Sequence, residues 1–244
     1  TARQTLTELI VHDLKNPIAK VQAIIDRLLS ESSASHLPGS VQSDLQLIRQ
    51  TSDELRQYIT SLLQLTRVEA RDIKLTKESC DINAIVEAVL ERVRPLATNK
   101  EIEIRTNLEP MFSLDLDRTL ITEVILNLVE NAVKYSRPKT WISVQTQEVG
   151  NQVRVEVEDI AGGIPENDIP RIFEKFYRGT QAAQSNRITG TGLGLYLVKY
   201  FIELHGGKVF IDTVPGVGTK IGFTLPLDSQ EEYEPATLAR SYRG

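Results

Sequence analysis

The N-terminal third of the chain shows a helical spacing of apolar residues. From Leu6 to Leu28 apolar side chains recur every three or four positions, and a second stripe of this kind runs from Val41 to Leu62. This spacing places an apolar stripe along one side of a helix. Residues 30–40 lie between the stripes and are rich in Ser, Pro and Gly, which predicts a loop. The pattern predicts an antiparallel hairpin of two long helices.

A single helical hairpin cannot bury two long apolar faces. Each helix would be about 40 Å long at 1.5 Å per residue. Two hairpins packed around a two-fold axis would cover these faces as a four-helix bundle. The sequence therefore predicts a homodimer formed through the hairpin.

After residue 72 helical and strand patterns alternate. Ile73–Leu75 is predicted to be a short linker strand, and Asp81 is predicted to cap the helix that follows it. Helices are predicted at Ile85–Leu96, Arg118–Lys134 and Gly194–His205, and strands at Ile102–Thr106, Trp141–Glu148, Val153–Asp159, Lys208–Thr213 and Thr219–Pro226. Strands in hairpin order with helices between them indicate an α/β sandwich, in which helices cover one face of a mixed sheet.

The expected fold class is therefore α+β. A helical hairpin of residues 1–72 precedes an α/β sandwich domain of residues 73–228, and an acidic C-terminal tail of residues 229–244 is expected to be solvated. Residues 71–76 would form a mobile linker that works as a hinge between the two domains.

Composition narrows the function classes. Of the 244 residues, 41% are apolar and 25% charged, and the net charge is -5, so no global field attracts nucleic acid or an anionic membrane. Nucleic acid is therefore not expected as a partner. One cysteine, Cys80, and three histidines exclude an internal disulfide and a Cys/His zinc site. No apolar run reaches the ~20 residues that span a bilayer, which predicts a soluble chain.

His12 lies in the first predicted helix between the stripe residues Ile10 and Leu14, so it should point away from the buried seam. A neutral imidazole is a nitrogen nucleophile that can take a phosphoryl group, and Asp13 can accept the hydrogen of the other ring nitrogen. The alternative is an ordinary solvent-facing histidine. Pro17 predicts a kink one turn later.

Asn127 and Asn131 lie one turn apart on the polar side of a predicted helix. A carboxamide oxygen is a hard neutral ligand suited to Mg²⁺, which shares its other positions with water and nucleotide phosphates. The alternative is a pair of ordinary amides on the helix surface.

Glycine-rich turns follow. The segment Gly190 to Gly194 opens a helix, where backbone N–H groups can approach an anion, but it matches neither a Rossmann dinucleotide motif nor a P-loop. Asp159 to Gly163 ends a strand with an acid and a flexible turn, whereas Gly216 to Thr219 fits either a site or a simple hairpin.

Aromatic and basic residues alternate over residues 171–178, which fits nucleic-acid stacking or packing beneath a nucleotide lid. Residues 181–189 predict a mobile loop.

Taken in order, these motifs resemble the catalytic core of a two-component sensor histidine kinase over about residues 1–227. The resemblance implies a dimerisation and histidine-phosphotransfer hairpin followed by a Bergerat-type ATP-binding domain. His12 would take the γ-phosphoryl group of ATP and pass it to an aspartate of a response regulator. Asp13 would assist the transfer, and Asn16 would position water to dephosphorylate the regulator, which implies phosphatase activity.

The resemblance also assigns the ATP site. Asn131 would ligate Mg²⁺ with Asn127 beside it near the phosphates, and Asp159 would recognise the adenine amino group. The other expected nucleotide contacts are Lys134 on the phosphate side, Tyr135 on the adenine side, Arg178 at the γ-phosphate, Gly190, Gly192, Leu193 and Gly194 in the lid, and Gly163 and Thr219 in the remaining motifs.

Ala161 departs from the family, which usually has glycine at this place. We expect its side chain to strain a turn that favours positive φ, with an effect on nucleotide binding, unless Gly162 shifts the turn. One alternative function is an ATPase of the same superfamily, but there a glutamate stands where this chain has Asn127. The other is a non-catalytic module whose shape ATP switches.

The expected location is the cytoplasm. Thr1 is expected to begin inside a helix, so the chain resembles a kinase core cut from a longer protein. Membrane attachment would then come only through a sensor region outside this sequence.

Overall fold

The computed structural model describes residues 18–28, 38–70, 73–179 and 191–227. In the first two ranges a helix of residues 18–28 lies beside α3 (Gly39–Glu69). Gln22 Nε2 donates to Asp53 Oδ1 at 2.6 Å, while Arg49 Nε lies 3.5 Å from Asp26 Oδ1. Earlier residues of one helix thus meet later residues of the other, which confirms the antiparallel arrangement.

The second domain begins with a short strand and a capped helix. β1 (Glu78–Cys80) pairs with β3 (Leu114–Leu116), and α4 (Ile82–Asn99) follows β1. The Asp81 side chain accepts the N–H groups of Asn83 and Ala84, so the predicted cap is confirmed. The predicted strand at Ile73–Leu75 is wrong, because pairing starts only at β1, where β3 supplies a partner.

The main sheet has five strands in the order β2-β4-β5-β7-β6. Its strands are β2 (Glu103–Leu108), β4 (Trp141–Val149), β5 (Gln152–Asp159), β6 (Lys208–Val214) and β7 (Gly218–Pro226). β2 and β4 are parallel and the other pairs antiparallel, so the prediction of a mixed sheet is confirmed.

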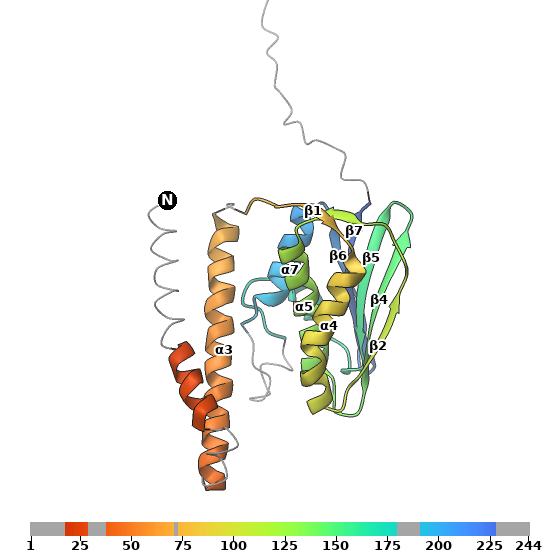
Figure 1. Ribbon diagram of the computed structural model, residues 1–244. Helices are drawn as coiled ribbons and strands as arrows, with labels where there is room; N and C mark the ends of the chain where they lie inside the picture. Colours follow the sequence, from red (N-terminus) through yellow and green to blue (C-terminus); the bar gives the residue numbers. More distant parts are fainter. Residues whose placement is uncertain (1–17, 29–37, 71–72, 180–190, 228–244) are drawn as a thin grey trace, which may run out of the picture.

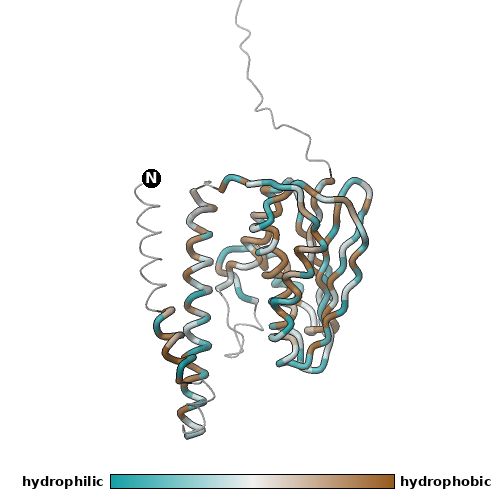
Figure 2. Tube along the Cα trace, viewed as in Figure 1, coloured by the Kyte–Doolittle hydropathy of each residue, from teal (hydrophilic) through white to brown (hydrophobic). Residues whose placement is uncertain are grey.

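Helices α4, α5 (Arg118–Tyr135) and α7 (Gly194–Leu204) cover one face of this sheet, as Figure 1 shows. Apolar side chains of α5 recur with the helical period, and Ile125, Leu128 and Val129 are fully buried. Figure 2 shows the hydrophobic residues gathered where these helices meet the sheet. A short 3-10 helix, η1 (Ile169–Arg171), lies in the connection from β5 to α7.

The end of α3 packs on the helix layer, on the side away from the sheet (Figure 1). Leu65 and Val68 are buried in the same apolar cluster as the core of the second domain. Next to them Gln64 Nε2 donates to both carboxylate oxygens of Glu123, at 2.5 and 2.6 Å. In this arrangement the hairpin and the α/β domain share a packed and hydrogen-bonded seam.

Candidate functional site

The polar side of α5 faces the start of α7. Asn127 Nδ2 donates to the carbonyl of Glu123 at 3.0 Å, and its Oδ1 lies 2.8 Å from the position a Cβ would take on Gly194. Glycine at 194 therefore lets α7 begin against this amide. One turn further along, the half-buried Asn131 makes no side-chain hydrogen bond within the described ranges, so its oxygen is available to a ligand.

Two more predicted nucleotide contacts, Lys134 and Tyr135, lie in the last turn of α5. Lys134 Nζ lies 5.3 Å from the ring centroid of Tyr135. Burial raises the pKa of the Tyr135 phenol, and the positive charge of Arg178 opposes this rise. Arg178 is thus within electrostatic reach of Tyr135, which brings a basic residue from the segment after η1 to the end of α5.

Asp159 ends β5 and is 9% exposed. Its Oδ1 accepts the N–H of Ala161 at 2.8 Å. Burial raises its pKa from the ordinary 3.8 to about 6, although backbone hydrogen bonds from Ala161 and Thr219 lower it. A buried carboxylate with few partners can accept a hydrogen bond from an amino group of a ligand.

The turn after Asp159 needs glycine at two positions, neither of which is residue 161. Gly162 and Gly163 have φ of +96° and +74°. A Cβ on Gly163 would collide with the carbonyl of Val214. Non-glycine residues with positive φ within the described ranges are Glu101, Lys139 and Phe176, and Ala161 is not among them. Ala161 is therefore not strained, and the alternative that Gly162 shifts the turn is confirmed, because the positive φ begins one residue later.

The turn between β6 and β7 supports this loop. Gly216 N donates to the carbonyl of Gly162 at 2.7 Å, and Thr213 Oγ1 accepts the N–H of Ile164 at 2.8 Å. The buried Thr219 pairs across strands with Asp159, and its hydroxyl lies 3.1 Å from that of Thr213. This turn therefore packs against the loop after Asp159, and its part in a nucleotide site stays a prediction.

Gly192, one of the two predicted lid glycines that the structure describes, packs on the aromatic segment. Gly192 has φ of +70°, and a Cβ there would lie 2.6 Å from the backbone carbon of Phe176. Tyr177 donates its hydroxyl to the buried Asp168 at 2.7 Å, and Leu193 is fully buried at the start of α7. The backbone of Phe176 and Tyr177 therefore packs directly against Gly192, just before α7 begins.

Arg137 joins the two halves of the site. It follows the last turn of α5, and its guanidinium lies 3.9 Å from the position of a Cβ on Gly162. Arg137 is not among the residues predicted from the sequence. Its signal would have been a basic side chain two positions after Tyr135.

Not every predicted residue is placed. His12, Asp13, Asn16 and Gly190 lie outside the described residues. The positions that the structure does describe form two adjoining groups, one around α5 and the start of α7, the other around the end of β5. Within the described ranges no group of three or more His, Cys, Asp or Glu could hold a metal ion. No described helix is long and apolar enough to cross a membrane.

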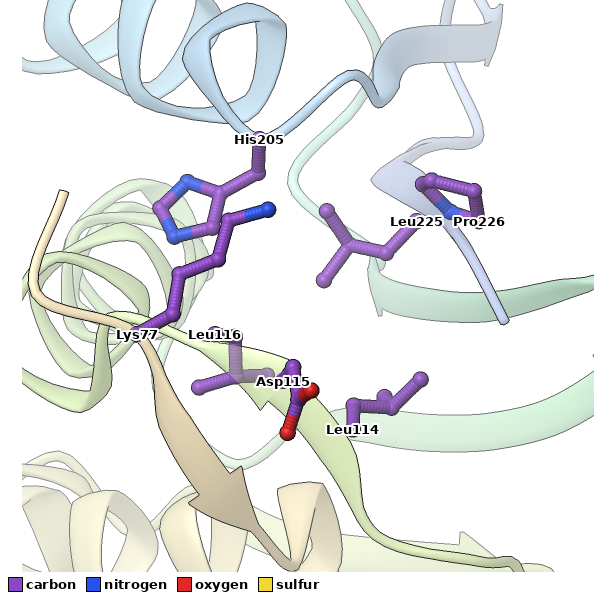
Figure 3. Close-up of a pocket in the computed structure, with 7 residues that line it drawn as sticks. All are labelled: Lys77, Leu114, Asp115, Leu116, His205, Leu225 and Pro226. Atoms are coloured by element: carbon purple, nitrogen blue, oxygen red, sulfur yellow. The ribbon is translucent and has the colours of Figure 1, made fainter. Parts of the chain in front are cut away.

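The buried histidine of the second domain lies away from this site. His205 Nδ1 donates to the carbonyl of Phe201 at 2.7 Å, and Nε2 accepts the N–H of Asp117 at 3.1 Å. Burial lowers its pKa, so it is neutral. Figure 3 shows it beside Lys77 and Leu116. Its partner Asp117 is the N-cap of α5, and Tyr135 is the last residue of the same helix, at the opposite end. Its bonds give it a structural role.

Two family models match the chain. Residues 2–71 match the His Kinase A (phospho-acceptor) domain, and residues 116–229 match the histidine kinase-, DNA gyrase B- and HSP90-like ATPase. Together they cover the hairpin and most of the second domain.

Relatives and solved structures agree with these matches. The sensor protein kinase WalK of Staphylococcus saprophyticus is 29% identical over 91% of this chain and 36% of its own length. The sensor-like histidine kinase SenX3 of Mycobacterium tuberculosis is 28% identical over 92% of this chain and 54% of its own length. The chain thus spans about a third to a half of these relatives.

Full-length ShkA in complex with AMPPNP has a similar structure, with a TM-score of 0.72 and 25% identity over 91% of this chain and 45% of that one. The histidine kinase AdeS of Acinetobacter baumannii, at 21% identity and a TM-score of 0.60, shares the fold. The fold, the order of the motifs and both family models lead to one assignment. The chain belongs to the two-component sensor histidine kinases and contains their catalytic core, a phosphoacceptor hairpin followed by an ATP-binding α/β sandwich.

Proposed function

We propose that this chain is an ATP-dependent protein kinase that phosphorylates its own His12 and then transfers the phosphoryl group to an aspartate of a response regulator. The observation that carries the proposal is the contact between Asn127 and Gly194, which places the polar side of α5 against the glycine-rich start of α7. The phosphoacceptor match of residues 2–71 supplies the nucleophile.

The transfer needs a nucleophile, a leaving group and a proton acceptor. An imidazole nitrogen of His12 attacks the γ-phosphorus, the bond to the β–γ bridging oxygen breaks, and ADP leaves with the electron pair. Asp13 accepts a hydrogen bond from the other ring nitrogen and takes up the proton that the imidazole releases. In the second step the N–P bond breaks as a regulator carboxylate oxygen bonds to phosphorus. In a separate phosphatase reaction, Asn16 would position a water that attacks the aspartyl phosphate of the regulator, which releases inorganic phosphate and restores the carboxylate.

The adenine end of ATP is assigned to Asp159. Its ionised oxygen accepts from the exocyclic amino group, and Thr219 and Gly163 form the walls of this part of the site. Tyr135 lies on the adenine side. Lys134 and Arg178 would supply positive charge on the phosphate side, where charge develops during transfer.

Mg²⁺ is the proposed metal. Asn131 fits it, because this residue is half-buried and its side chain makes no hydrogen bond within the described ranges. Bound Mg²⁺ would neutralise charge on the phosphates. Gly192, Leu193 and Gly194, together with Gly190, would bring backbone N–H groups to the phosphates at the start of α7.

A second copy of the chain is the proposed partner of the hairpin. Val41, Ile48 and Leu55 stand seven positions apart on α3 and are 38%, 47% and 48% exposed. Such a stripe is the seam of a helical bundle, and a symmetric dimer would cover it. Residues 1–72 would be the dimerisation domain, 73–228 the catalytic domain and 229–244 a tail. The kinase core would be cytoplasmic.

An ATPase of the same superfamily is the weaker candidate. Its water-activating glutamate would stand at position 127, where this chain has an asparagine. Glu123 does not replace it, because both of its carboxylate oxygens accept hydrogen bonds from Gln64 on α3. The nearest acid one turn earlier is thus directed at the hairpin.

Incubation with Mg²⁺ and γ-labelled ATP tests the proposal. We expect an acid-labile label on the wild-type chain and no label on His12→Gln, because a carboxamide cannot replace the imidazole nucleophile. His36→Gln, which changes another histidine of the hairpin sequence, is the matched control and should keep the label. An acid-stable label, or an undiminished one on His12→Gln, would refute the assignment.

A further inference from the structure

Lys100 connects the end of α4 to the end of α5. Its Nζ donates to three backbone carbonyls, those of Val133 at 3.0 Å, Lys134 at 2.7 Å and Ser136 at 3.3 Å. A lysine ammonium has three donors, so all of them are used at one helix end. Burial lowers the pKa of this ammonium, in keeping with its enclosed position.

The carbonyls that Lys100 meets are those a helix leaves unpaired. The last four C=O groups of an α-helix lack an intrahelical partner. In α5 the N–H of Ser136 donates to the carbonyl of Ala132, and the Lys100 ammonium donates to the next two carbonyls, those of Val133 and Lys134. A cation at this end also complements the negative end of the helix dipole.

The backbone around Lys100 is itself held in place. Ile102 N donates to the carbonyl of Ala97 at 2.9 Å, and Glu101 between them has φ of +56°, which makes a tight turn after α4. The carbonyl of Lys100 accepts the N–H of Lys139 at 3.3 Å. Lys100 therefore holds the last turn of α5 through its side chain and the connection after α5 through its backbone carbonyl.

We propose that Lys100 is a positioning residue for nucleotide binding, which fixes the last turn of α5 so that Lys134 and Tyr135 meet ATP in one arrangement. This inference rests on the proposed function, because it needs Lys134 and Tyr135 to be nucleotide contacts. Lys100 itself would act through the backbone, since its ammonium is bonded to carbonyls. Loss of its ammonium lets the last turn fray, so the cost falls on binding rather than on the transfer step.

Binding of AMPPNP and the kinetics of autophosphorylation test this role in the full chain. Lys100→Met removes the donors and keeps the side-chain length. We expect the Kd for AMPPNP and the KM for ATP to rise about tenfold, with kcat at saturating ATP within about twofold of wild type. Lys100→Arg, which keeps a cation with several donors, should restore the Kd to within about threefold.

Lys139→Met is the matched control. Lys139 is an exposed lysine at the same end of α5, 3.9 Å from Glu101, and its replacement removes the same charge. Its Kd should equal that of wild type. An unchanged Kd in Lys100→Met, or a Kd raised as much in Lys139→Met, would overturn the proposal. So would an equal loss in kcat and in kcat/KM, since that would place Lys100 in the transfer step.

Hydrogen exchange separates local from global effects. In Lys100→Met, faster exchange should be confined to the amides of residues 133–136. If Lys100→Met does not fold, Lys100→Gln takes its place, with an intermediate rise of Kd expected and a wild-type Kd counting against the role. Failure of wild type to bind AMPPNP refutes the proposed function. Wild-type binding that Lys100 does not influence refutes this inference alone.

Discussion

The hairpin and the ATP-binding domain use their apolar residues in opposite ways. In the second domain, three helices and a sheet enclose residues such as Ile121, Leu128 and Phe223, all fully buried. In the described part of the hairpin, the separate cluster consists of Ile18 and Ile59 with Leu63 packed against them. Leu47 and Ile24 meanwhile remain 62% and 50% exposed. The α/β domain buries its apolar residues in one core, which Leu65 and Val68 of α3 join, whereas the described part of the hairpin leaves large apolar side chains exposed.

A truncation in the core should destabilise the α/β domain. Leu128→Ala on α5 removes a fully buried side chain, and we expect it to lower the free energy of unfolding by about 2–5 kcal/mol. Trp141, the single tryptophan, lies in β4 and reports on this domain in urea unfolding. Leu96→Ala, at a 48% exposed site on α4, is the control and should change stability little. Equal losses in both variants would contradict the comparison.

A charge on the exposed apolar stripe of α3 should disrupt the dimer of the hairpin. Ile48→Glu occurs twice in a symmetric dimer, so we expect it to weaken association by about 3 kcal/mol or more. Sedimentation should show monomers, while the Trp141 unfolding midpoint stays the same. Gln46→Glu adds the same charge at an exposed position off the stripe and should leave the dimer intact. A dimer that survives Ile48→Glu would mean that the stripe is not its interface.

Asp159 differs from the other buried residues of the well-packed α/β domain. Its carboxylate lowers the free energy of unfolding and serves ligand binding instead. With a pKa raised to about 6, the folded state binds more protons than the unfolded state between pH 3.8 and 6. Stability therefore falls as pH rises through this window and stays reduced above it. We expect Asp159→Asn to raise the free energy of unfolding at pH 7 by up to about 3 kcal/mol and to weaken ATP binding at least about tenfold.

Two measurements check this opposition between stability and binding. They are the free energy of unfolding in urea at pH 5 and 7.5 and the affinity for AMPPNP under the same conditions. Wild-type affinity should also fall below pH 6, as the carboxylate takes up a proton. Asp212→Asn removes an exposed carboxylate of the same domain and should leave both quantities unchanged. If Asp159→Asn destabilised the ligand-free protein, burial would not be the cause of the raised pKa.

The smallest effect is expected at the seam between the regions. Gln64→Ala removes the donors to Glu123 and leaves a carboxylate whose pKa burial already raises. The loss should be about 1 kcal/mol in the free energy of unfolding, the net value of a hydrogen bond. Gln46→Ala provides the baseline for removing an exposed glutamine from α3. No difference between the two variants would mean that the seam contributes nothing to stability.

The sequence determined most elements and the order of the motifs. Periodic burial along α5, the capping by Asp81 and the alternation in β5 are local properties, set by side-chain spacing and by one or two backbone bonds. The asparagines of α5 share a face for the same reason. The prediction of a strand at Ile73–Leu75 failed because a strand exists only where a distant segment, here β3, supplies hydrogen bonds.

The tertiary structure decided what depends on contacts between distant segments. Whether Ala161 is strained could not be read from residue types, because the positive φ falls on Gly162 and Gly163, and at Gly163 the carbonyl of Val214 leaves no room for a side chain. The same holds for Lys100 on the end of α5 and for Gln64 on Glu123. Their partners lie tens of positions away, and local spacing carries no information about which distant groups folding brings within hydrogen-bond distance.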